Sequence, residues 1–176
     1  MKRAGFTLVE LLIVIAIIGV LAGLVMAAVT RANAKAKEAV AKTMIDNIRT
    51  AMTNYHEDVG YYPSGGAEND EGIINLVLAL YDPSEAEGGK GGPNSPYYDF
   101  KESDLEPSKS SSGSKVLIDP WGSPWRYVRA RDAAGNIKDG VHSRHSYDLW
   151  SIGPNKIDDH GEKDIKNDKD DIASWQ

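Results

Sequence analysis

A lone carboxylate at the start of a long uncharged segment is the feature of this sequence with the clearest chemical consequence. Glu10 follows the basic pair Lys2 and Arg3, and the next residues, from Leu11 to Thr30, contain no charged side chain. A carboxylate in apolar surroundings costs several kcal/mol unless a cation neutralises it. We therefore expect Glu10 to have a cationic partner, and the identity of that partner bears directly on the function.

A second group of residues with capacity for chemistry lies near the C-terminus. Residues 156–176 contain seven acidic side chains and four lysines. Carboxylate and carbonyl oxygens suit Ca²⁺, which takes six to eight oxygen ligands. The run from Asp164 to Asp170 is not an EF-hand, because the central Gly and the final Glu of that motif are missing. The alternative interpretation of the segment is a solvated acidic tail.

Two histidines are the remaining candidates for a metal or catalytic site. His142 and His145 are three residues apart, but the sequence has no cysteine and offers no clear third ligand. Ser143 and Ser146 beside them lack the motif of a nucleophile elbow. We therefore expect no catalytic residues and predict that the protein is not an enzyme.

Composition limits the class of protein further. The chain has 176 residues, a formal net charge of -6 and no cysteine. The acidic balance argues against nucleic acid as a partner, because phosphate binding needs a basic face. The missing cysteines exclude disulfides and thiolate metal sites. The length fits one membrane segment and one small domain.

The apolar segment from Leu11 to Val29 is long enough to cross a membrane. At about 1.5 Å per residue it matches a hydrocarbon core of ~30 Å. It could be a secretory signal cut near Ala27-Ala28, a plain anchor, or an anchor that is processed ahead of the apolar run, after Gly5. Gly19 and Gly23 form a G-x-x-x-G pattern, which predicts close helix packing in lipid.

The helix is predicted to continue beyond the membrane. No proline occurs before Pro63, and apolar residues recur at helical spacing up to Gly60, which is expected to end the helix. One helix of about fifty residues would be ~75 Å long. The apolar face comprises Val40, Met44, Ile45, Ile48, Met52, Tyr55 and Val59.

The rest of the chain predicts a small α+β head. Ile73, Val77, Leu80 and Tyr81 recur at helical spacing and predict a short second helix, with a cap at Asn69-Asp70-Glu71 and an end at Asp82-Pro83. Most of 84–115 is predicted to be a surface loop because it is rich in Gly, Ser and Pro. Short strands are predicted at 116–118, 125–129 and 147–152. They would form a small antiparallel sheet that packs on the long helix and buries the tryptophans.

The N-terminal residues also carry a family resemblance. Lys2-Arg3-Ala4-Gly5 followed by Phe6-Thr7-Leu8-Val9-Glu10 resembles the class III leader of type IV pilins and type II secretion pseudopilins. The resemblance implies that a prepilin peptidase cuts after Gly5 and that Phe6 becomes an N-methylated N-terminus. The new α-ammonium at Phe6 would lie near Glu10 of an adjacent, staggered subunit, and the two charges would offset each other.

Further motifs lie in the head. They are Tyr62-Pro63-Ser64, Glu71-Gly72, Asp119-Pro120-Trp121-Gly122 with Pro124 and Tyr127, Tyr147-Asp148 with Ser151 and Gly153, and Asp171-Ile172 with Trp175. Together they resemble the major pseudopilins of type II secretion. The absence of cysteine also differs from type IV pilins, which commonly have a C-terminal disulfide loop. The resemblance implies the type IV pilin-like fold.

This resemblance implies four parts of the chain and an orientation. We expect a leader at 1–5, a transmembrane and filament-core helix at 6–30, an amphipathic helix at 31–59 packed on the head, and a globular periplasmic head at 60–176. The chain would cross the bacterial inner membrane once. The basic residues on both sides of the apolar segment leave the orientation to the resemblance alone.

The resemblance also implies one calcium ion in a C-terminal loop at about 149–176. Its ligands would be the carbonyls of Ile152 and Ile157, the side chain of Asn155, and the carboxylates of Asp170 and Asp171. Two departures from the family are visible. Asn155 stands where the family usually has Asp, and residues 163–169 resemble an insertion, which makes Asp168 an alternative to one of the acidic pair.

The expected function is that of a structural subunit. The chain would polymerise with itself into a periplasmic pseudopilus that drives folded proteins across the outer membrane. Its other partners would be the prepilin peptidase, minor pseudopilins and an inner-membrane assembly platform. Two alternatives are a type IV pilin for adhesion, motility or DNA uptake, and a membrane-anchored binding module that never polymerises.

Overall fold

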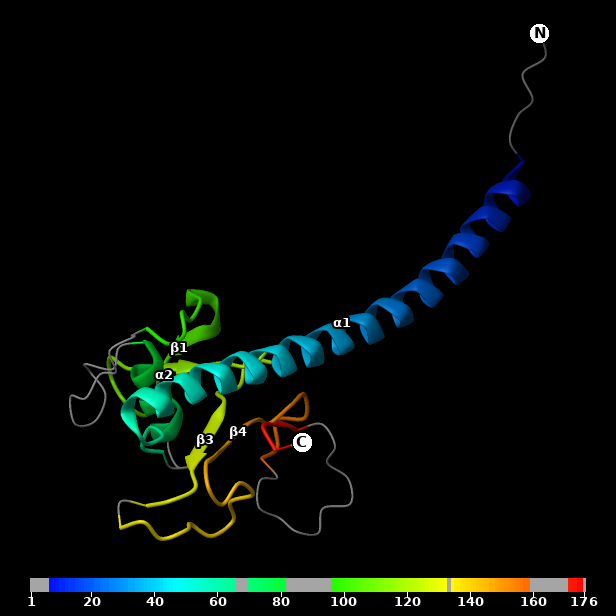
Figure 1. Cartoon of the computed structure of the whole chain (residues 1–176). Helices are drawn as coiled ribbons and strands as arrows, with labels where there is room; N and C mark the ends of the chain where they lie inside the picture. The colour runs from blue at the N-terminus through cyan, green and yellow to red at the C-terminus, as the bar shows by residue number, and fades with distance from the viewer. Residues whose placement is uncertain (1–6, 66–69, 82–95, 133, 159–170, 176) are drawn as a thin grey trace. The chain divides into compact units, whose positions relative to one another are not determined.

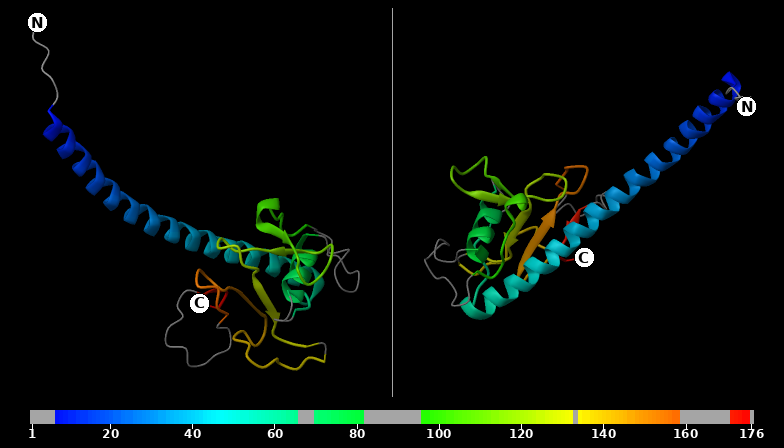
Figure 2. Two further views of the ribbon diagram at one scale, coloured as in Figure 1. Left: turned by 180° about the vertical axis from the view of Figure 1, so that it is seen from behind. Right: turned by 90° about the horizontal axis from the view of Figure 1, so that it is seen from above.

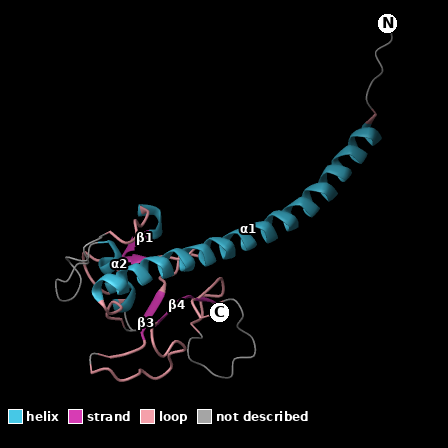
Figure 3. Ribbon diagram, viewed as in Figure 1, coloured by secondary structure: helices cyan, strands magenta, loops and turns pink. Residues whose placement is uncertain are grey.

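The computed structural model describes residues 7–65, 70–81, 96–132, 134–158 and 171–175. The chain divides into two compact units, residues 1–37 and 38–176, each with its own internal contacts. Figures 1 and 3 show the elements along the chain. In order they are helix α1 (Leu8–Val59), helix α2 (Glu71–Tyr81), 3-10 helix η1 (Glu102–Asp104), and strands β1 (Leu105–Pro107), β2 (Lys115–Leu117), β3 (Arg126–Arg129), β4 (Tyr147–Ser151) and β5 (Ile172–Ala173).

The described part of the first unit is helical and apolar. Residues 8–37 belong to α1, and every described side chain from Thr7 to Val40 is exposed in the single chain. The best 18-residue window of α1 has a mean hydropathy of 3.0, so the helix is long and apolar enough to cross a membrane. An exposed apolar surface of this extent requires lipid or other protein to cover it.

The second unit is built on the other half of α1. Its buried face comprises Ala41, Met44, Ile45, Ile48, Ala51, Met52 and Tyr55. Val40, which the sequence pattern assigns to the apolar face, is 53% exposed, and Ala41 is buried instead. The helix ends as expected, because Gly60 has a φ of 87° and its N–H bonds to the carbonyl of His56 at 2.8 Å. The predicted long N-terminal helix is thus confirmed.

Helix α2 is mostly buried and packs against β2 and β3. Its apolar residues recur at helical spacing, and Ile73, Leu76 and Leu80 are at most 1% exposed. Figure 2 shows α2, the strands and the C-terminal half of α1 together in this unit. The short second helix predicted from the spacing of Ile73, Val77, Leu80 and Tyr81 is confirmed.

The strands form two small antiparallel sheets instead of the single sheet expected. Strands β1 and β2 pair with Leu105 opposite Leu117, and β3, β4 and β5 form a separate three-stranded sheet. Strand β1 and η1 lie within the segment that was predicted to be mostly loop. Strand β1 contains Pro107 and has no buried side chain, so its sequence has little strand character and its pairing with β2 defines it.

The core contains two of the four tryptophans. Trp125 and Trp150 are at most 1% exposed, whereas Trp121 and Trp175 are only partly buried. Residues 62–65 run across β3, where the Tyr127 hydroxyl donates to the carbonyl of Pro63 at 2.9 Å. The Tyr-Pro-Ser motif therefore connects α1 to the sheet through hydrogen bonds as well as through packing.

Candidate assembly site and C-terminal loop

Glu10 lies in the first turn of α1, where it forms a capping box with Thr7. The backbone N–H and the hydroxyl of Thr7 donate to Oε2 of Glu10 at 2.9 and 2.8 Å, and the N–H of Glu10 donates to the Thr7 hydroxyl at 3.2 Å. This reciprocal arrangement satisfies N–H groups that a helix start leaves without partners. The sequence interpretation missed it, although Thr-x-x-Glu ahead of an apolar run is a known signal for such a cap.

The capping box leaves the carboxylate accessible. Glu10 is exposed in the single chain, and both hydrogen bonds from Thr7 end on Oε2. The predicted cleavage site at Gly5 and the predicted new N-terminus at Phe6 lie outside the described residues. The cap therefore fixes the orientation of Glu10, and its role toward a second subunit stays a prediction.

Gly19 and Gly23 lie on an open part of α1. A Cβ atom built on either glycine meets no heavy atom within 4 Å, and neither glycine has a positive φ. The backbone is thus accessible along this stripe in the single chain. The predicted packing role of the two glycines concerns contacts with other helices and stays a prediction.

The Asp119-Pro120-Trp121-Gly122 turn is organised by a buried carboxylate. Asp119 is 3% exposed, and its Oδ1 accepts the N–H groups of Trp121 and Ser123 at 2.9 and 2.8 Å. Its Oδ2 accepts the hydroxyl of Ser151 at 2.6 Å. Gly122 has a φ of 80°, a conformation that favours glycine. The motif is therefore a hydrogen-bonded turn that is tied to the end of β4.

The segment after β4 is a tight turn with two left-handed residues. Gly153 and Lys156 have φ values of 63° and 61°, and the N–H of Gly153 donates to the Ser151 hydroxyl at 3.1 Å. The side-chain oxygen of Asn155 accepts the N–H of Ile157 at 2.7 Å. The predicted calcium residues Ile152, Asn155 and Ile157 thus all belong to one short turn.

Strand register brings Asp171 to the start of this turn. Strand β5 pairs antiparallel with β4, with Ser151 opposite Ile172. The residue that follows β4, Ile152, and the residue that precedes β5, Asp171, therefore lie at the same end of the two strands. Oδ1 of Asp171 is buried. The fifth predicted ligand, Asp170, and the alternative ligand Asp168 lie outside the described residues.

These donors fit the chemistry of calcium. They offer a carboxylate, an amide oxygen and backbone carbonyls, which are the oxygen ligands that Ca²⁺ takes. Within the described ranges, no three His, Cys, Asp or Glu side chains come together as a metal site. Carbonyls and an amide would therefore have to supply most of the described part of the coordination shell.

Asp158 closes the turn, and the sequence interpretation gave it no role. Its Oδ1 accepts the indole N–H of Trp150 at 3.0 Å, and its Oδ2 lies 3.4 Å from Nε of Arg126. Arg126 also bonds through Nη1 to Oδ1 of Asp70 at 3.1 Å. No local pattern indicates these contacts, because they join residues from three separate parts of the chain.

His142 is held by groups that explain its position without a metal. Its ring stacks on Trp175, with centroids 4.3 Å apart and an interplanar angle of 3°. The backbone N–H groups of His142 and Ser143 donate to the buried carboxylate of Asp148 at 2.6 and 2.9 Å. The loop that contains the histidine is thus tied to β4 and to the C-terminal segment.

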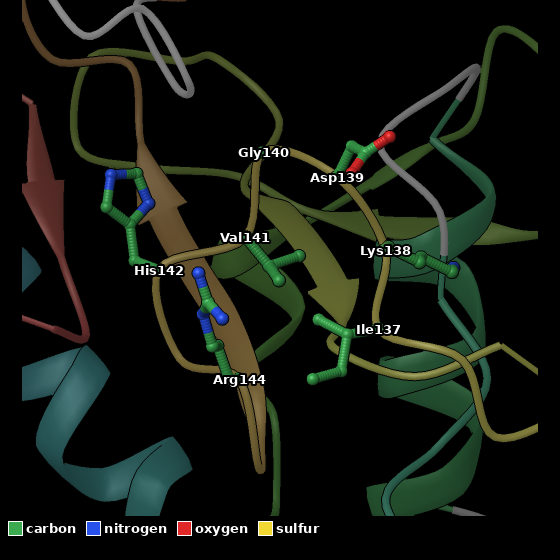
Figure 4. Close-up of a pocket in the computed structure, with 7 residues that line it drawn as sticks. All are labelled: Ile137, Lys138, Asp139, Gly140, Val141, His142 and Arg144. Carbon is green, nitrogen blue, oxygen red and sulfur yellow. The ribbon is translucent and has the colours of Figure 1, made fainter.

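The same loop lines a surface pocket of about 460 Å³. In Figure 4 the side chain of Lys138 points away from the Val141 side of the pocket, and its Nζ donates to the carbonyl of Gly65. The lining residues include no hydroxyl or thiol nucleophile; they are Ile137, Lys138, Asp139, Gly140, Val141, His142 and Arg144.

Comparison with known proteins finds one motif and a set of relatives. Residues 1–26 match the prokaryotic N-terminal methylation motif. Type II secretion system core protein G of Pseudomonas aeruginosa is 30% identical over 174 residues, covering 99% of this chain and 96% of the relative. The protein of the same name from Escherichia coli K12 is also 30% identical over 174 residues, covering 99% of this chain and 92% of the relative.

Other matches are partial or more distant. A fimbrial protein of Neisseria meningitidis is 40% identical over 62 residues, which cover 35% of this chain and 36% of that protein. The crystal structure of the major pseudopilin from the type 2 secretion system of enterohaemorrhagic Escherichia coli aligns with a TM-score of 0.38 and 15% identity. That alignment covers 80% of this chain and 88% of the crystallised chain.

Proposed function

The chain belongs to the type II secretion system core protein G family, the major pseudopilins, and we propose on this basis that it works as the structural subunit of a type II secretion pseudopilus. The observation that carries the proposal is 30% identity over 174 residues to a relative of nearly equal length. That similarity includes the head as well as the leader region. The expected family is confirmed by this match.

Processing is the first step of the proposed function. The methylation motif over residues 1–26 supports cleavage after Gly5 by a prepilin peptidase and N-methylation of Phe6. Before cleavage, the leader with Lys2 and Arg3 precedes Phe6, so the positive charge of an N-terminus is displaced from this site. Cleavage would therefore create the cation that Glu10 needs as a partner.

Assembly is proposed to depend on an ion pair between subunits. The α-ammonium of Phe6 in one subunit would pair with the Glu10 carboxylate of its neighbour, because opposite charges in a low-dielectric helix bundle attract strongly. Glu10 is exposed, oriented by Thr7, and retains Oε1 for this contact, since the capping bonds use Oε2. The pair would set the register of each incoming subunit.

The exposed apolar half of α1 supports two successive environments for the protein. It would lie in the inner membrane before assembly and in the filament core afterwards, with residues 60–176 on the periplasmic side. Minor pseudopilins and an inner-membrane platform would guide assembly, and a cytoplasmic ATPase would supply the energy. The subunit itself would catalyse no reaction, in keeping with its structural relatives.

The head is proposed to bind one calcium ion at the end of β4 and β5. Carbonyls of Ile152 and Ile157, the amide oxygen of Asn155 and the carboxylate of Asp171 would be the described ligands. The ion would supply positive charge beside the buried Oδ1 of Asp171 and would link the turn to β5. Supporting this proposal are the oxygen chemistry of the donors and the strand register that places Ile152 beside Asp171.

A type IV pilin is the second candidate, because fimbrial relatives reach 40% identity over 62 residues. Deleting the gene for this chain separates the two functions when protein export and surface fibres are both measured. The proposed function predicts loss of export of folded proteins across the outer membrane, with unchanged surface fibres. Normal export together with loss of surface fibres would instead identify a pilin.

A further inference from the structure

We propose that Arg126 and Asp158 are positioning residues for calcium: together they hold the turn of residues 152–157 in place before the ion binds. This inference rests on the proposed calcium binding and concerns residues that are not themselves among the predicted ligands. The inference follows from the contacts of Ser151 and Asp158 at the two ends of the turn, and from the ion pair that holds Arg126 to Asp70.

The start of the turn is held by Ser151. Its hydroxyl accepts the N–H of Gly153 at 3.1 Å and donates to Oδ2 of the buried Asp119 at 2.6 Å. Asp119 in turn is fixed by two backbone N–H groups of its own turn. The direction in which the chain leaves β4 is therefore set by hydrogen bonds among buried groups.

The end of the turn is held by Asp158. Its two carboxylate oxygens contact Trp150 Nε1 at 3.0 Å and Arg126 Nε at 3.4 Å. Arg126 and Trp150 are register partners on β3 and β4, so both donors come from one cross-strand pair. Since Trp150 is 1% exposed, the position of its indole N–H is fixed by the core.

The guanidinium of Arg126 is itself held from the other side. Its Nη1 lies 3.1 Å from Oδ1 of Asp70, the residue just before α2, and the side chains of Arg126 and Asp70 are 24% and 15% exposed. A guanidinium offers several donors in a rigid plane, so it can bridge two carboxylates at once. Arg126 thus connects the turn to the start of α2 as well as to the sheet.

These contacts identify Asp158 as a positioning residue and argue against a role as a ligand. Both of its oxygens already accept hydrogen bonds or ion-pair contacts, and the nearby guanidinium would repel a divalent cation at Oδ2. Residues that orient the ligands of a metal typically change its affinity by about 10–100-fold when they are altered. Because both ends of the turn are fixed before the ion binds, binding costs less conformational entropy.

The test is calorimetric titration of Ca²⁺ into the full-length chain in detergent micelles. Asp158→Asn and Arg126→Gln should each weaken calcium binding by about tenfold, as expected for orienting residues. The double variant should be little weaker than either single variant, because the two residues act through one contact. Asp132→Asn is the matched control: it also removes one carboxylate, but from a separate turn in which Asp132 accepts the N–H of Asn136.

The outcomes separate this inference from the calcium proposal. If the unmodified chain binds no Ca²⁺, the calcium proposal is wrong and this inference falls with it. If the unmodified chain binds Ca²⁺ and Asp158→Asn binds it equally well, only the positioning role is overturned. Urea unfolding of each variant in EDTA provides the second readout. If Arg126 and Asp158 only stabilised the fold, the variants would unfold at a lower urea concentration without calcium, and their affinity for calcium would be unchanged.

A second variant tests the same contact from the side of its other partner. Trp150→Phe keeps a large ring in the core but removes the indole N–H that donates to Oδ1 of Asp158. It should weaken calcium binding in the same direction but by a smaller factor than Asp158→Asn, since the Arg126 contact remains. Unchanged affinity in a folded Trp150→Phe variant would contradict the proposal.

Discussion

The hydroxyl of Ser151 donates a hydrogen bond of 2.6 Å to Oδ2 of Asp119, across 32 residues of sequence. This contact joins the Asp119-Pro120-Trp121-Gly122 turn to the end of β4. The same hydroxyl accepts the N–H of Gly153 at the start of the proposed calcium turn. Two motifs that look independent in the sequence are therefore parts of one hydrogen-bond network.

Removing the carboxylate at the centre of this network should destabilise the head. Asp119→Ala leaves two backbone N–H groups and the Ser151 hydroxyl without their acceptor in a buried site. We expect the free energy of unfolding to fall by roughly 2–4 kcal/mol. Urea unfolding of the full-length chain in micelles, followed by tryptophan fluorescence, measures it. Asp99→Ala at an exposed position should change stability by less than about 0.5 kcal/mol, and an equal loss in both variants would contradict the prediction.

Gly65 should tolerate no side chain. A Cβ atom there would clash with the ring of Tyr127, which is buried and whose hydroxyl donates to the carbonyl of Pro63. Gly65→Ala should therefore cost about 1–3 kcal/mol, the usual range for overpacking. The same urea experiment measures the loss. Gly23→Ala, where a Cβ meets nothing within 4 Å, is the control and should leave the unfolding of the head unchanged.

The head should lose stability at alkaline pH because of its buried tyrosines. Burial raises the pKa of Tyr55 to about 12 and that of Tyr147 to about 12, from an ordinary value of 10.0, and raises the pKa of Tyr127 well above that value. A raised folded pKa means that the unfolded chain releases these protons first. The stability is therefore complete below pH 10 and falls as the pH rises from 10 towards 12.

Ultraviolet titration of tyrosine ionisation tests this pH dependence. The buried tyrosines should ionise only above pH 11, together with unfolding, whereas in urea all tyrosines should ionise near pH 10. Tyr55→Phe should reduce the slope of stability against pH, because one of the shifted groups is gone. A native head in which Tyr55, Tyr127 and Tyr147 ionise near pH 10 would contradict the account.

The two glycines of the apolar half of α1 should matter for assembly and not for folding. Gly19→Leu and Gly23→Leu would place bulk where the single chain has open space, so head stability should be unchanged. Helix packing at small-residue stripes requires close backbone approach, so we expect fewer filaments. Counting filaments by electron microscopy measures this. Ala28→Leu is a control on the face opposite Gly19, since nine residues rotate a helix by about 180°. An equal loss of filaments in Ala28→Leu would argue against a specific packing role for Gly19 and Gly23.

The helices could be predicted from the sequence, but several contacts could not. Periodic apolar residues are a local signal, and they predicted the long helix and the second helix with ends near Val59 and Tyr81. Strand β1 and the ion pair of Arg126 with Asp158 depend on residues that are distant in the sequence. The capping box, by contrast, is a local feature, because Thr7 and Glu10 have the Thr-x-x-Glu spacing of this motif ahead of an apolar run.

The central claim is that the negative charge of Glu10 drives assembly, and Glu10→Gln tests it most directly. A glutamine can keep the capping box with Thr7 but has no charge for the α-ammonium of a neighbour. Thr7→Val is the matched control, because it removes the hydroxyl of the cap and leaves the charge.

The measurement is the amount of filament formed by each variant at equal levels in the membrane. The account predicts that Glu10→Gln is inserted and cut after Gly5 but forms no filaments, while Thr7→Val still assembles. Normal filaments from Glu10→Gln would contradict the claim that the charge of Glu10 drives assembly. Loss of filaments in Thr7→Val but not in Glu10→Gln would show instead that Glu10 acts through the helix cap.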